Sequence, residues 1–200
     1  KKESYKAFIN TPSLESIINE SNSNFCLLED KSVYESDKSL VFVPRNLTNY
    51  TISPHCLTIH SSAFCGPNLE SVSFSDNSLI TIENCAFAHS TGLKSITIPK
   101  YVQSIGNEAF IDCRNLECVE FELGSQLKKI NKFCFAFSGL KSVVLPSSLE
   151  IISHSSFYFC QNLKSINLND TNIKLIDNYA FSDANIEEIK LPTTIEKIGN

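Results

Sequence analysis

The 200-residue sequence contains no methionine, and its first residue is Lys1. A chain without an initiator methionine is expected to be processed or to be a piece of a longer protein, so targeting signals can lie outside it. No apolar run approaches the roughly 18–20 residues that a membrane-spanning helix needs, and no apolar segment is typical of a signal peptide. We therefore expect membrane attachment only through an anchor outside this chain.

Positive charge is also scarce. The chain has 17 Lys and Arg residues against 22 Asp and Glu residues, which gives a formal net charge of −5. A protein without a basic field does not gather phosphates, so nucleic acids and anionic membranes are disfavoured as partners. The hydrophobic content of 42% and the charged content of 20% are typical of a folded globular chain rather than a disordered one.

The usual signatures of catalysis and cofactor binding are missing as well. The sequence has no Gly-rich phosphate loop and no Cys-x-x-Cys pair of the kind that indicates a zinc site. Its four histidines, His55, His60, His89 and His154, do not converge with paired carboxylates, and we expect them to lie at the surface or to cap turns. The sequence therefore predicts a non-enzymatic protein with no cofactor, no metal site and no small-molecule substrate.

What the sequence does contain is a repeat of 22 to 25 residues. Phenylalanine recurs at Phe64, Phe87, Phe110, Phe135, Phe157 and Phe181. An isoleucine stands five residues before each of them, at Ile59, Ile82, Ile105, Ile130, Ile152 and Ile176. A leucine or isoleucine follows each phenylalanine by five or six residues, and a valine or isoleucine comes three residues later. Such self-similarity indicates stacked units that together bury one continuous core.

Each unit is expected to form a short strand followed by a turn. Val119 and Phe121 end an apolar alternation of period two, which predicts a strand with one buried face. In three copies a proline follows and ends the strand, because proline lacks the N–H that a sheet needs. After Ile105, we expect Gly106 to bend the chain and Asn107 to cap a short helical turn with its side-chain oxygen.

Two segments carry a resemblance to a known family. SIGNEAFIDCRNLECVEF, which starts at Ser104, and SHSSFYFCQNLKSINL, which starts at Ser153, resemble the BspA-like leucine-rich repeats, whose pattern recurs about every 23 residues. The resemblance covers residues 52–200 closely and implies an α/β solenoid with a parallel concave β-sheet and short helical turns. BspA-like proteins are typically surface-exposed in bacteria and protozoan parasites, so it also implies a surface antigen that adheres to host matrix or cell-surface proteins.

We interpret residues 1–200 as one solenoid with three parts. The segment KAFINTPSLESI, from Lys6, predicts a partial repeat in residues 1–20, and residues 53–200 hold the regular repeats, the last of them truncated. Residues 21–52 contain short β-prone runs, which predict a β-meander or hairpin island inserted between repeats. The alternative is two degenerate repeats. Because both ends lie inside repeats, we expect the natural protein to continue in both directions.

The eight cysteines are expected to be mostly free and buried as small hydrophobic residues. Cys113 and Cys160 occupy the same position two repeats apart, which places them roughly 10 Å from each other. That separation exceeds the roughly 7 Å between Cα atoms that a disulfide tolerates. Cys26 and Cys56 can pair if the meander brings them together.

The residues that alternate with the buried strand positions are the candidate binding site. On the expected concave sheet these outward positions are Ser71, Ser73, Ser95, Thr97, Glu120, Ser142, Val144, Ser165, Asn167, Glu188 and Lys190. Small hydroxyl groups form a shallow polar surface suited to a protein partner, and the alternative is that serine only keeps the sheet soluble. Two functions remain open: an adhesion module at the cell surface or secreted, and a cytoplasmic scaffold or regulatory subunit.

Overall fold

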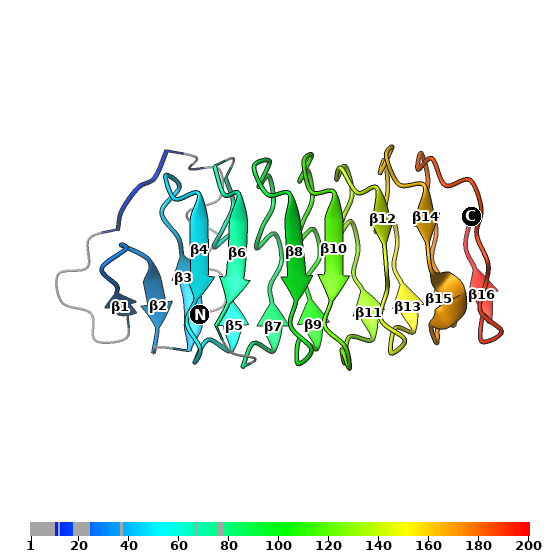
Figure 1. The fold of residues 1–200 in the computed structure, drawn as a ribbon, viewed down its shortest axis with the longest axis horizontal. Coiled ribbons are helices and arrows are strands. Elements are labelled where there is room, and N and C mark those ends of the chain that lie inside the picture. Colours follow the sequence, from blue (N-terminus) through cyan, green and yellow to red (C-terminus); the bar gives the residue numbers. More distant parts are fainter. Residues whose placement is uncertain (1–10, 12, 18–24, 37, 67, 76–77) are drawn as a thin grey trace.

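The computed structural model describes residues 11, 13–17, 25–36, 38–66, 68–75 and 78–200. The chain winds into successive coils that stack along one axis (Figure 1). Most coils contribute a strand of two or four residues to a first sheet, a two-residue strand to a second sheet, and a turn that closes the coil. The architecture is a β-solenoid.

The first sheet is the parallel sheet that the repeat predicted. It contains β4 (Asn49–Ile52), β6 (Ser71–Phe74), β8 (Ser95–Ile98), β10 (Cys118–Phe121), β12 (Ser142–Val143) and β14 (Ser165–Ile166). β4 pairs with β6, β8 to β14 form one parallel ladder, and β6 lies beside β8. Val119 faces Ile96 and Val143 across the ladder, and all three are buried. The predicted apolar alternation is therefore confirmed.

The second sheet was not predicted. It contains β5 (Thr58–Ile59), β7 (Thr81–Ile82), β9 (Ser104–Ile105), β11 (Lys129–Ile130), β13 (Ile151–Ile152), β15 (Leu175–Ile176) and β16 (Lys197–Ile198). These strands are parallel and form two ladders, β5 to β9 and β11 to β16, with β9 lying beside β11. In each pair one isoleucine faces the next, as Ile82 faces Ile105. The isoleucine that precedes each phenylalanine thus belongs to a strand, and most of these residues are fully buried.

The turn on the third side is not the short helix that the sequence predicted. The N–H of Phe87 donates to the carbonyl of Ala109 in the next coil at 2.8 Å, whereas the N–H of Ala88 donates to Cys85, three residues back, at 3.0 Å. Cys85 and His89 have φ values of 55° and 59°, which lie outside the helical region. The same 2.8 Å bond to a carbonyl of the next coil is made by the backbone N–H groups of Phe64, Phe87, Phe110, Phe135 and Phe157.

Helix formation requires each N–H to bond four residues back along its own chain. In this turn, half of the N–H groups bond to the neighbouring coil instead, so no helix forms. Within the described residues the one helical element is a 3-10 turn, η2 (Leu168–Asp170). The expected α/β solenoid is therefore corrected to a β-solenoid with a column of non-helical turns.

Asn107 and Gly106 also act differently from the prediction. The side-chain oxygen of Asn107 accepts from the N–H of Lys132 in the next coil at 3.2 Å, so it links coils rather than capping a helix. Asn84 bonds in the same way to the N–H of Asn107 at 2.8 Å. A Cβ atom at Gly106 would lie 2.4 Å from the backbone nitrogen of Asn84. Glycine stands there because two coils approach closely, not because the chain bends.

The core is built around a stack of phenylalanine rings. Neighbouring rings from Phe64 to Phe181 stack with centroid separations of 4.6 to 5.4 Å. The recurring cysteine links neighbouring coils beside this stack. Cys113 Sγ donates to the carbonyl of Phe87 and Cys160 Sγ to the carbonyl of Phe135, each in the preceding coil and at 3.1 Å. Serine occupies the same position in the coil before Cys113, where Ser90 Oγ donates to the carbonyl of Phe64 at 3.0 Å.

The eight cysteines all lie in the described part of the chain and form no disulfide with one another. Five of them are buried, as the sequence predicted, namely Cys56, Cys65, Cys113, Cys134 and Cys160. The suggested pairing of Cys26 with Cys56 is wrong. Cys26 lies on the outermost strand, opposite Tyr34 on the next strand. A third strand then separates these two strands from the coil of Cys56.

The N-terminal strands form an antiparallel meander that continues the second sheet. β1 (Phe25–Leu27) pairs with β2 (Val33–Glu35), which pairs with β3 (Ser39–Phe42), and β3 then pairs in parallel with β5. Because β3 and β4 are both parallel to solenoid strands, residues 39–52 form a coil of their own. The antiparallel part is thus smaller than the expected island at 21–52, and most of the expected partial repeat at 1–20 lies outside the described residues.

Candidate binding surface

The predicted outward residues lie mostly where the alternation places them. Ser71, Ser73, Ser95, Thr97, Glu120, Ser142 and Ser165 are exposed on strands of the first sheet. Val144 is 68% exposed and directly follows β12. These side chains share one face of the sheet, which we call the outward face.

Three predicted residues do not belong to this array. Asn167 is half-buried, because its side-chain oxygen accepts from the N–H of Leu145 at 2.6 Å and its amide nitrogen donates to the same residue's carbonyl at 3.2 Å. The Asn167 side chain takes the place of the backbone hydrogen bonds between strands that are lost where β12 and β14 end. Glu188 and Lys190 are exposed and lie 3.6 Å apart, but the described part of the first sheet ends at β14, one coil earlier.

Asn49 and Thr51 extend the outward face in the other direction. Ser71 Oγ donates to Asn49 Oδ1 at 2.6 Å, and the hydroxyls of Thr51 and Ser73 are 2.9 Å apart. The sequence prediction missed both residues because it assigned them to the inserted island. Asn49 and Thr51 flank the buried Tyr50, and this alternation of polar and apolar residues could have identified them as outward positions of a strand.

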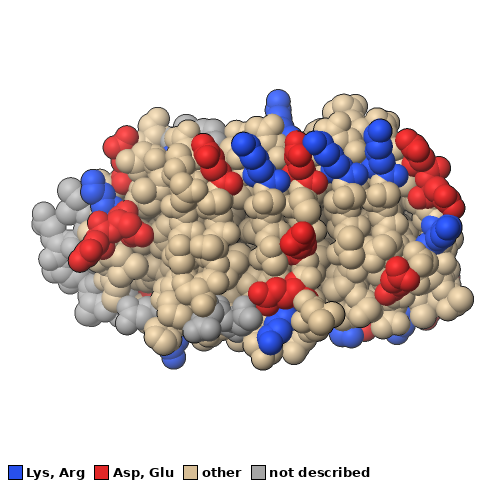
Figure 2. All heavy atoms as spheres, in the orientation of Figure 1, with Lys and Arg blue, Asp and Glu red and all other residues tan. Residues whose placement is uncertain are grey.

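A row of charged residues borders the outward face. The residue directly before the first outward position is charged in six coils and exposed in each, at Glu70, Lys94, Glu117, Lys141, Lys164 and Glu187. Lys141 Nζ lies 2.8 Å from Glu117 Oε2 in the coil before it. Figure 2 shows charged side chains along the upper border of this face, whereas the middle is mostly uncharged. We call these six residues the charged row.

His60 is buried, whereas the sequence predicted that it would lie at the surface or cap a turn. Its Nδ1 lies 3.1 Å from a carboxylate oxygen of Glu83, and its Nε2 lies 3.7 Å from Glu35 on β2. Glu83 also accepts from the N–H and the hydroxyl of Ser61, both at 3.1 Å, and the hydrogen bond from His60 is the main reason that the pKa of Glu83 is lowered. The bonds from Ser61 to the Glu83 carboxylate tie two neighbouring coils together.

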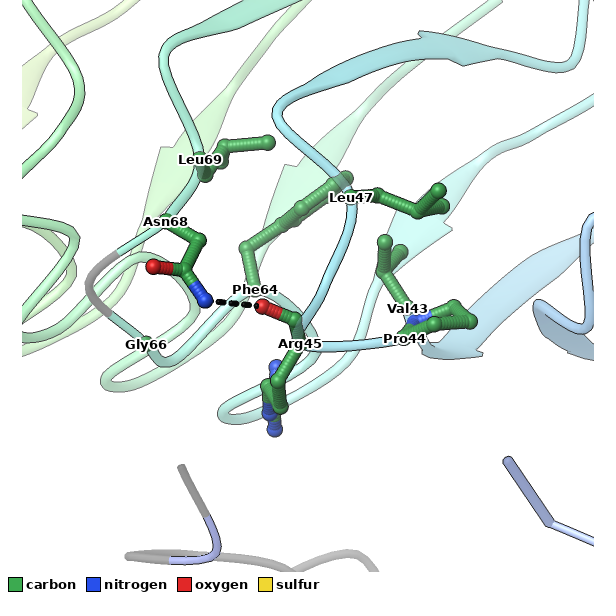
Figure 3. A pocket seen from close by; sticks show the side chains of 8 residues that line it. All are labelled: Val43, Pro44, Arg45, Leu47, Phe64, Gly66, Asn68 and Leu69. Carbon is green, nitrogen blue, oxygen red and sulfur yellow. Dashed lines mark hydrogen bonds between the residues drawn. The ribbon is translucent and has the colours of Figure 1, made fainter. Parts of the chain in front are cut away.

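Arg45 is likewise a buried charge with a structural role. Its guanidinium donates to the carbonyls of Ala63 at 2.8 Å and Ser62 at 3.0 Å and lies over the ring of Phe42. These carbonyls begin the column of turns, so Arg45 covers its N-terminal end. Figure 3 shows the surrounding hollow and the bond from Asn68 to the carbonyl of Arg45. The hollow has a volume of about 10 Å³, which has room for about one water molecule and is too small for a larger ligand.

The described residues hold neither a cluster suited to a metal ion nor a helix that could span a membrane. No group of three His, Cys, Asp or Glu side chains there could hold a metal ion. No helix among them has the length and hydropathy to cross a membrane.

Comparison with known proteins gives a consistent picture of the repeat. Residues 35–138 and 128–200 match the model of the BspA type leucine-rich repeat region, in six copies. No curated protein matches the chain.

Two solved structures share the fold. A leucine-rich repeat protein from Eubacterium ventriosum is 27% identical with a TM-score of 0.86, and the match covers 96% of this chain and 53% of that one. A leucine-rich repeat protein from Bacteroides ovatus is 24% identical with a TM-score of 0.60, covering 96% of this chain and 54% of that one. The chain therefore spans about half the length of these two proteins.

Proposed function

Because the chain belongs to the BspA-type leucine-rich repeat family, we propose that it is a non-enzymatic protein-binding module of a cell-surface or secreted protein. In general this family is a scaffold for protein interactions. The partner is a protein of a host matrix or cell surface, and it docks on the outward face of the first sheet. The module thereby acts in adhesion.

The observation that carries this proposal is the chemistry of the outward face. Its exposed serines and threonines can both donate and accept hydrogen bonds. Their short side chains have few rotamers to lose when a partner docks, so the entropic cost of binding is small. Parallel pairing holds these hydroxyls in regular columns, for example Thr51 beside Ser73 and Ser142 beside Ser165.

The size of the face indicates what else the partner touches. Four strands of four residues, about 13 Å long, and two strands of two residues, about 7 Å long, spaced by about 4.8 Å, present about 300 Å² in projection. A standard protein interface buries about 800 Å² on each partner, so the outward face cannot supply a complete interface by itself. We place the remaining contacts on the charged row. Its mixed signs favour a partner with complementary charges and an association rate that falls with salt.

The test is to place positive charge in the middle of the face. Ser95→Lys combined with Thr97→Lys should weaken binding to immobilised extracellular-matrix proteins about tenfold or more, as measured by surface plasmon resonance. The matched control, Gln103→Lys with Ser104→Lys, adds the same charge at exposed residues at β9 on the second sheet. Unchanged binding in the first pair, or equal weakening in both pairs, would contradict docking on the outward face.

A second candidate, an intracellular scaffold or regulatory subunit, is favoured by the absence of disulfides among the eight cysteines, because disulfides are common in oxidising compartments. Burial weakens this argument. It raises the pKa of Cys160 to about 11 and raises that of Cys113 further, so little reactive thiolate exists in either compartment. Antibody labelling of intact cells discriminates the two: a signal without lysis supports the surface module, and a signal only after lysis supports the scaffold.

A further inference from the structure

The column of turns carries aromatic residues in a backbone conformation that does not suit them. Each turn has two residues with positive φ four positions apart, and in one coil these are Glu108 and Asp112. In the three coils that follow, the positions with φ between 53° and 58° include Phe133, Phe137, Phe159 and Tyr179. Asn, Asp and Gly tolerate this region best, and bulky side chains are outliers in it. Glu108 and Asp112 show that the turn itself does not require a ring.

The core does not require these rings either. Phe137, Phe159 and Tyr179 are 39%, 38% and 55% exposed, and they lie outside the buried phenylalanine stack. Phe137 packs against Phe159 and Tyr158 with ring centroids 5.5 and 5.3 Å apart, so the two exposed phenylalanine rings and the half-buried Tyr158 form one cluster. The fold imposes positive φ at these positions in every turn, but neither the fold nor the core explains why aromatic residues occupy them, and this is a reason to look for a ligand.

A depression of about 300 Å³ opens beside two of these rings. Phe137 and Phe159 line it together with Asp112, Arg114, Gln161 and Asn162. This volume is at the lower end of the range for small-molecule sites, and the combination of aromatic walls with a few polar groups is typical of them.

The charges in the depression cancel. Arg114 Nε donates to Asp112 Oδ1 at 2.7 Å, and the other carboxylate oxygen lies 3.0 Å from His89 Nδ1. A cationic ligand would meet Arg114 and an anionic ligand would meet Asp112, so the site favours a neutral one. Gln161 and Asn162 are exposed and carry both donors and acceptors. A purely apolar ligand would leave these groups without water or partners.

We propose that this depression binds a neutral sugar ring of a glycan. A sugar ring has a face of C–H groups, which suits the electron-rich faces of Phe137 and Phe159. Its hydroxyls both donate and accept, so they match the side-chain amides of Gln161 and Asn162 and the Asp112–Arg114 pair. The site lies on the column of turns, away from the outward face, and does not depend on the protein-binding function proposed above.

The test uses Phe137→Asn with Phe159→Asn. Asparagine tolerates positive φ, so this double variant removes both rings while relieving the backbone. The probes are an array of neutral and charged glycans, followed by calorimetric titration of the best neutral oligosaccharide and of its monosaccharide. We expect a neutral glycan to bind wild-type protein and affinity to fall about tenfold or more in the double variant, with a melting temperature that does not fall. The matched control, Phe133→Asn, removes an aromatic residue at positive φ outside the depression and should leave binding unchanged.

Several outcomes would overturn the proposal. These are equal glycan binding by the double variant, equal loss in the control, and binding restricted to charged glycans. Absence of glycan binding, together with a peptide-library ligand that the double variant loses, would reassign the site to peptides. A large fall in melting temperature in the double variant would show that the rings are structural. Monosaccharide binding as tight as that of the oligosaccharide would point to a free sugar rather than a glycan.

Discussion

The side-chain oxygen of Asn84 accepts from the backbone N–H of Asn107, and Asn107 repeats this bond to Lys132 one coil further on. The first bond is 2.8 Å long and the second 3.2 Å. At the other end of the array, Asn178 makes the same bond to the N–H of Asn200 at 3.0 Å. The side-chain oxygens of these asparagines thus link neighbouring coils by accepting from backbone N–H groups of the next coil.

Replacement of Asn107 by alanine should therefore remove one bond between coils. We expect Asn107→Ala to lower the free energy of unfolding by about 1 kcal/mol, the net worth of an ordinary hydrogen bond. Urea denaturation measures this change. Asn107→Asp keeps an acceptor oxygen opposite the N–H of Lys132 and should lose less. If both variants lost the same amount, the hydrogen bond would not be the cause.

Phe110 lies in the middle of the phenylalanine stack and is fully buried. Phe110→Ala should cost about 3–5 kcal/mol of unfolding free energy, because it removes the ring and leaves a cavity between two rings. Phe159→Ala serves as the control, since that ring is 38% exposed and outside the stack. We expect the control to lose far less, and comparable losses would contradict the assignment of the core.

Arg45 covers the two carbonyls that begin the column of turns. Arg45→Ala should destabilise the fold by about 2–3 kcal/mol. Hydrogen bonds from a charged donor contribute about 1.5–3 kcal/mol each, and removal of a buried charge offsets part of the loss. Arg45→Lys keeps the charge but not the two-pronged donor, so it should fall between alanine and wild type in a denaturation experiment. A loss below about 0.5 kcal/mol in the alanine variant would contradict the covering role.

Glu83 should make the stability depend on pH. The hydrogen bond from His60 holds the pKa of Glu83 below its ordinary value of 4.5 in the folded state. A lowered folded pKa contributes stability above the unfolded value, and this contribution is lost as pH falls through the folded pKa. Glu83→Gln should thus cost about 1 kcal/mol at pH 7, limited by the partial exposure of the carboxylate, and the difference from wild type should shrink below pH 4.5. Denaturation curves between pH 3 and pH 7 would show a constant difference if the pairing were unimportant.

The first sheet and the core could be predicted because the same residue types return in every coil. Ile105, Phe110 and Val119 each have an apolar counterpart one period away, and burial in a stack is the common cause. The second sheet could not be predicted, because a strand of two residues such as Ser104–Ile105 is too short to show an alternation.

The turn conformation was ambiguous for a different reason. An asparagine after Ile105 can satisfy an N–H in its own turn or in the next coil, and both arrangements select the same residue type. Arg45, Asn49 and Thr51 were missed because only 19 residues separate Leu40 from Ile59, which breaks the period. The aromatic cluster was missed because Phe137 and Phe159 stand two residues after the repeated phenylalanine, at a position that holds other residue types in earlier coils.

The bonding between coils has a mechanical consequence. Most coils are attached to their neighbours through strands of the two sheets and through the column of turns, so a force that pulls the ends apart along the axis detaches one coil at a time. Release of one coil of about 23 residues lengthens the chain by about 75 Å. A force-extension trace should rise and fall in steps of that length, and a module tethered between two surfaces would yield by single coils while the others keep their shape.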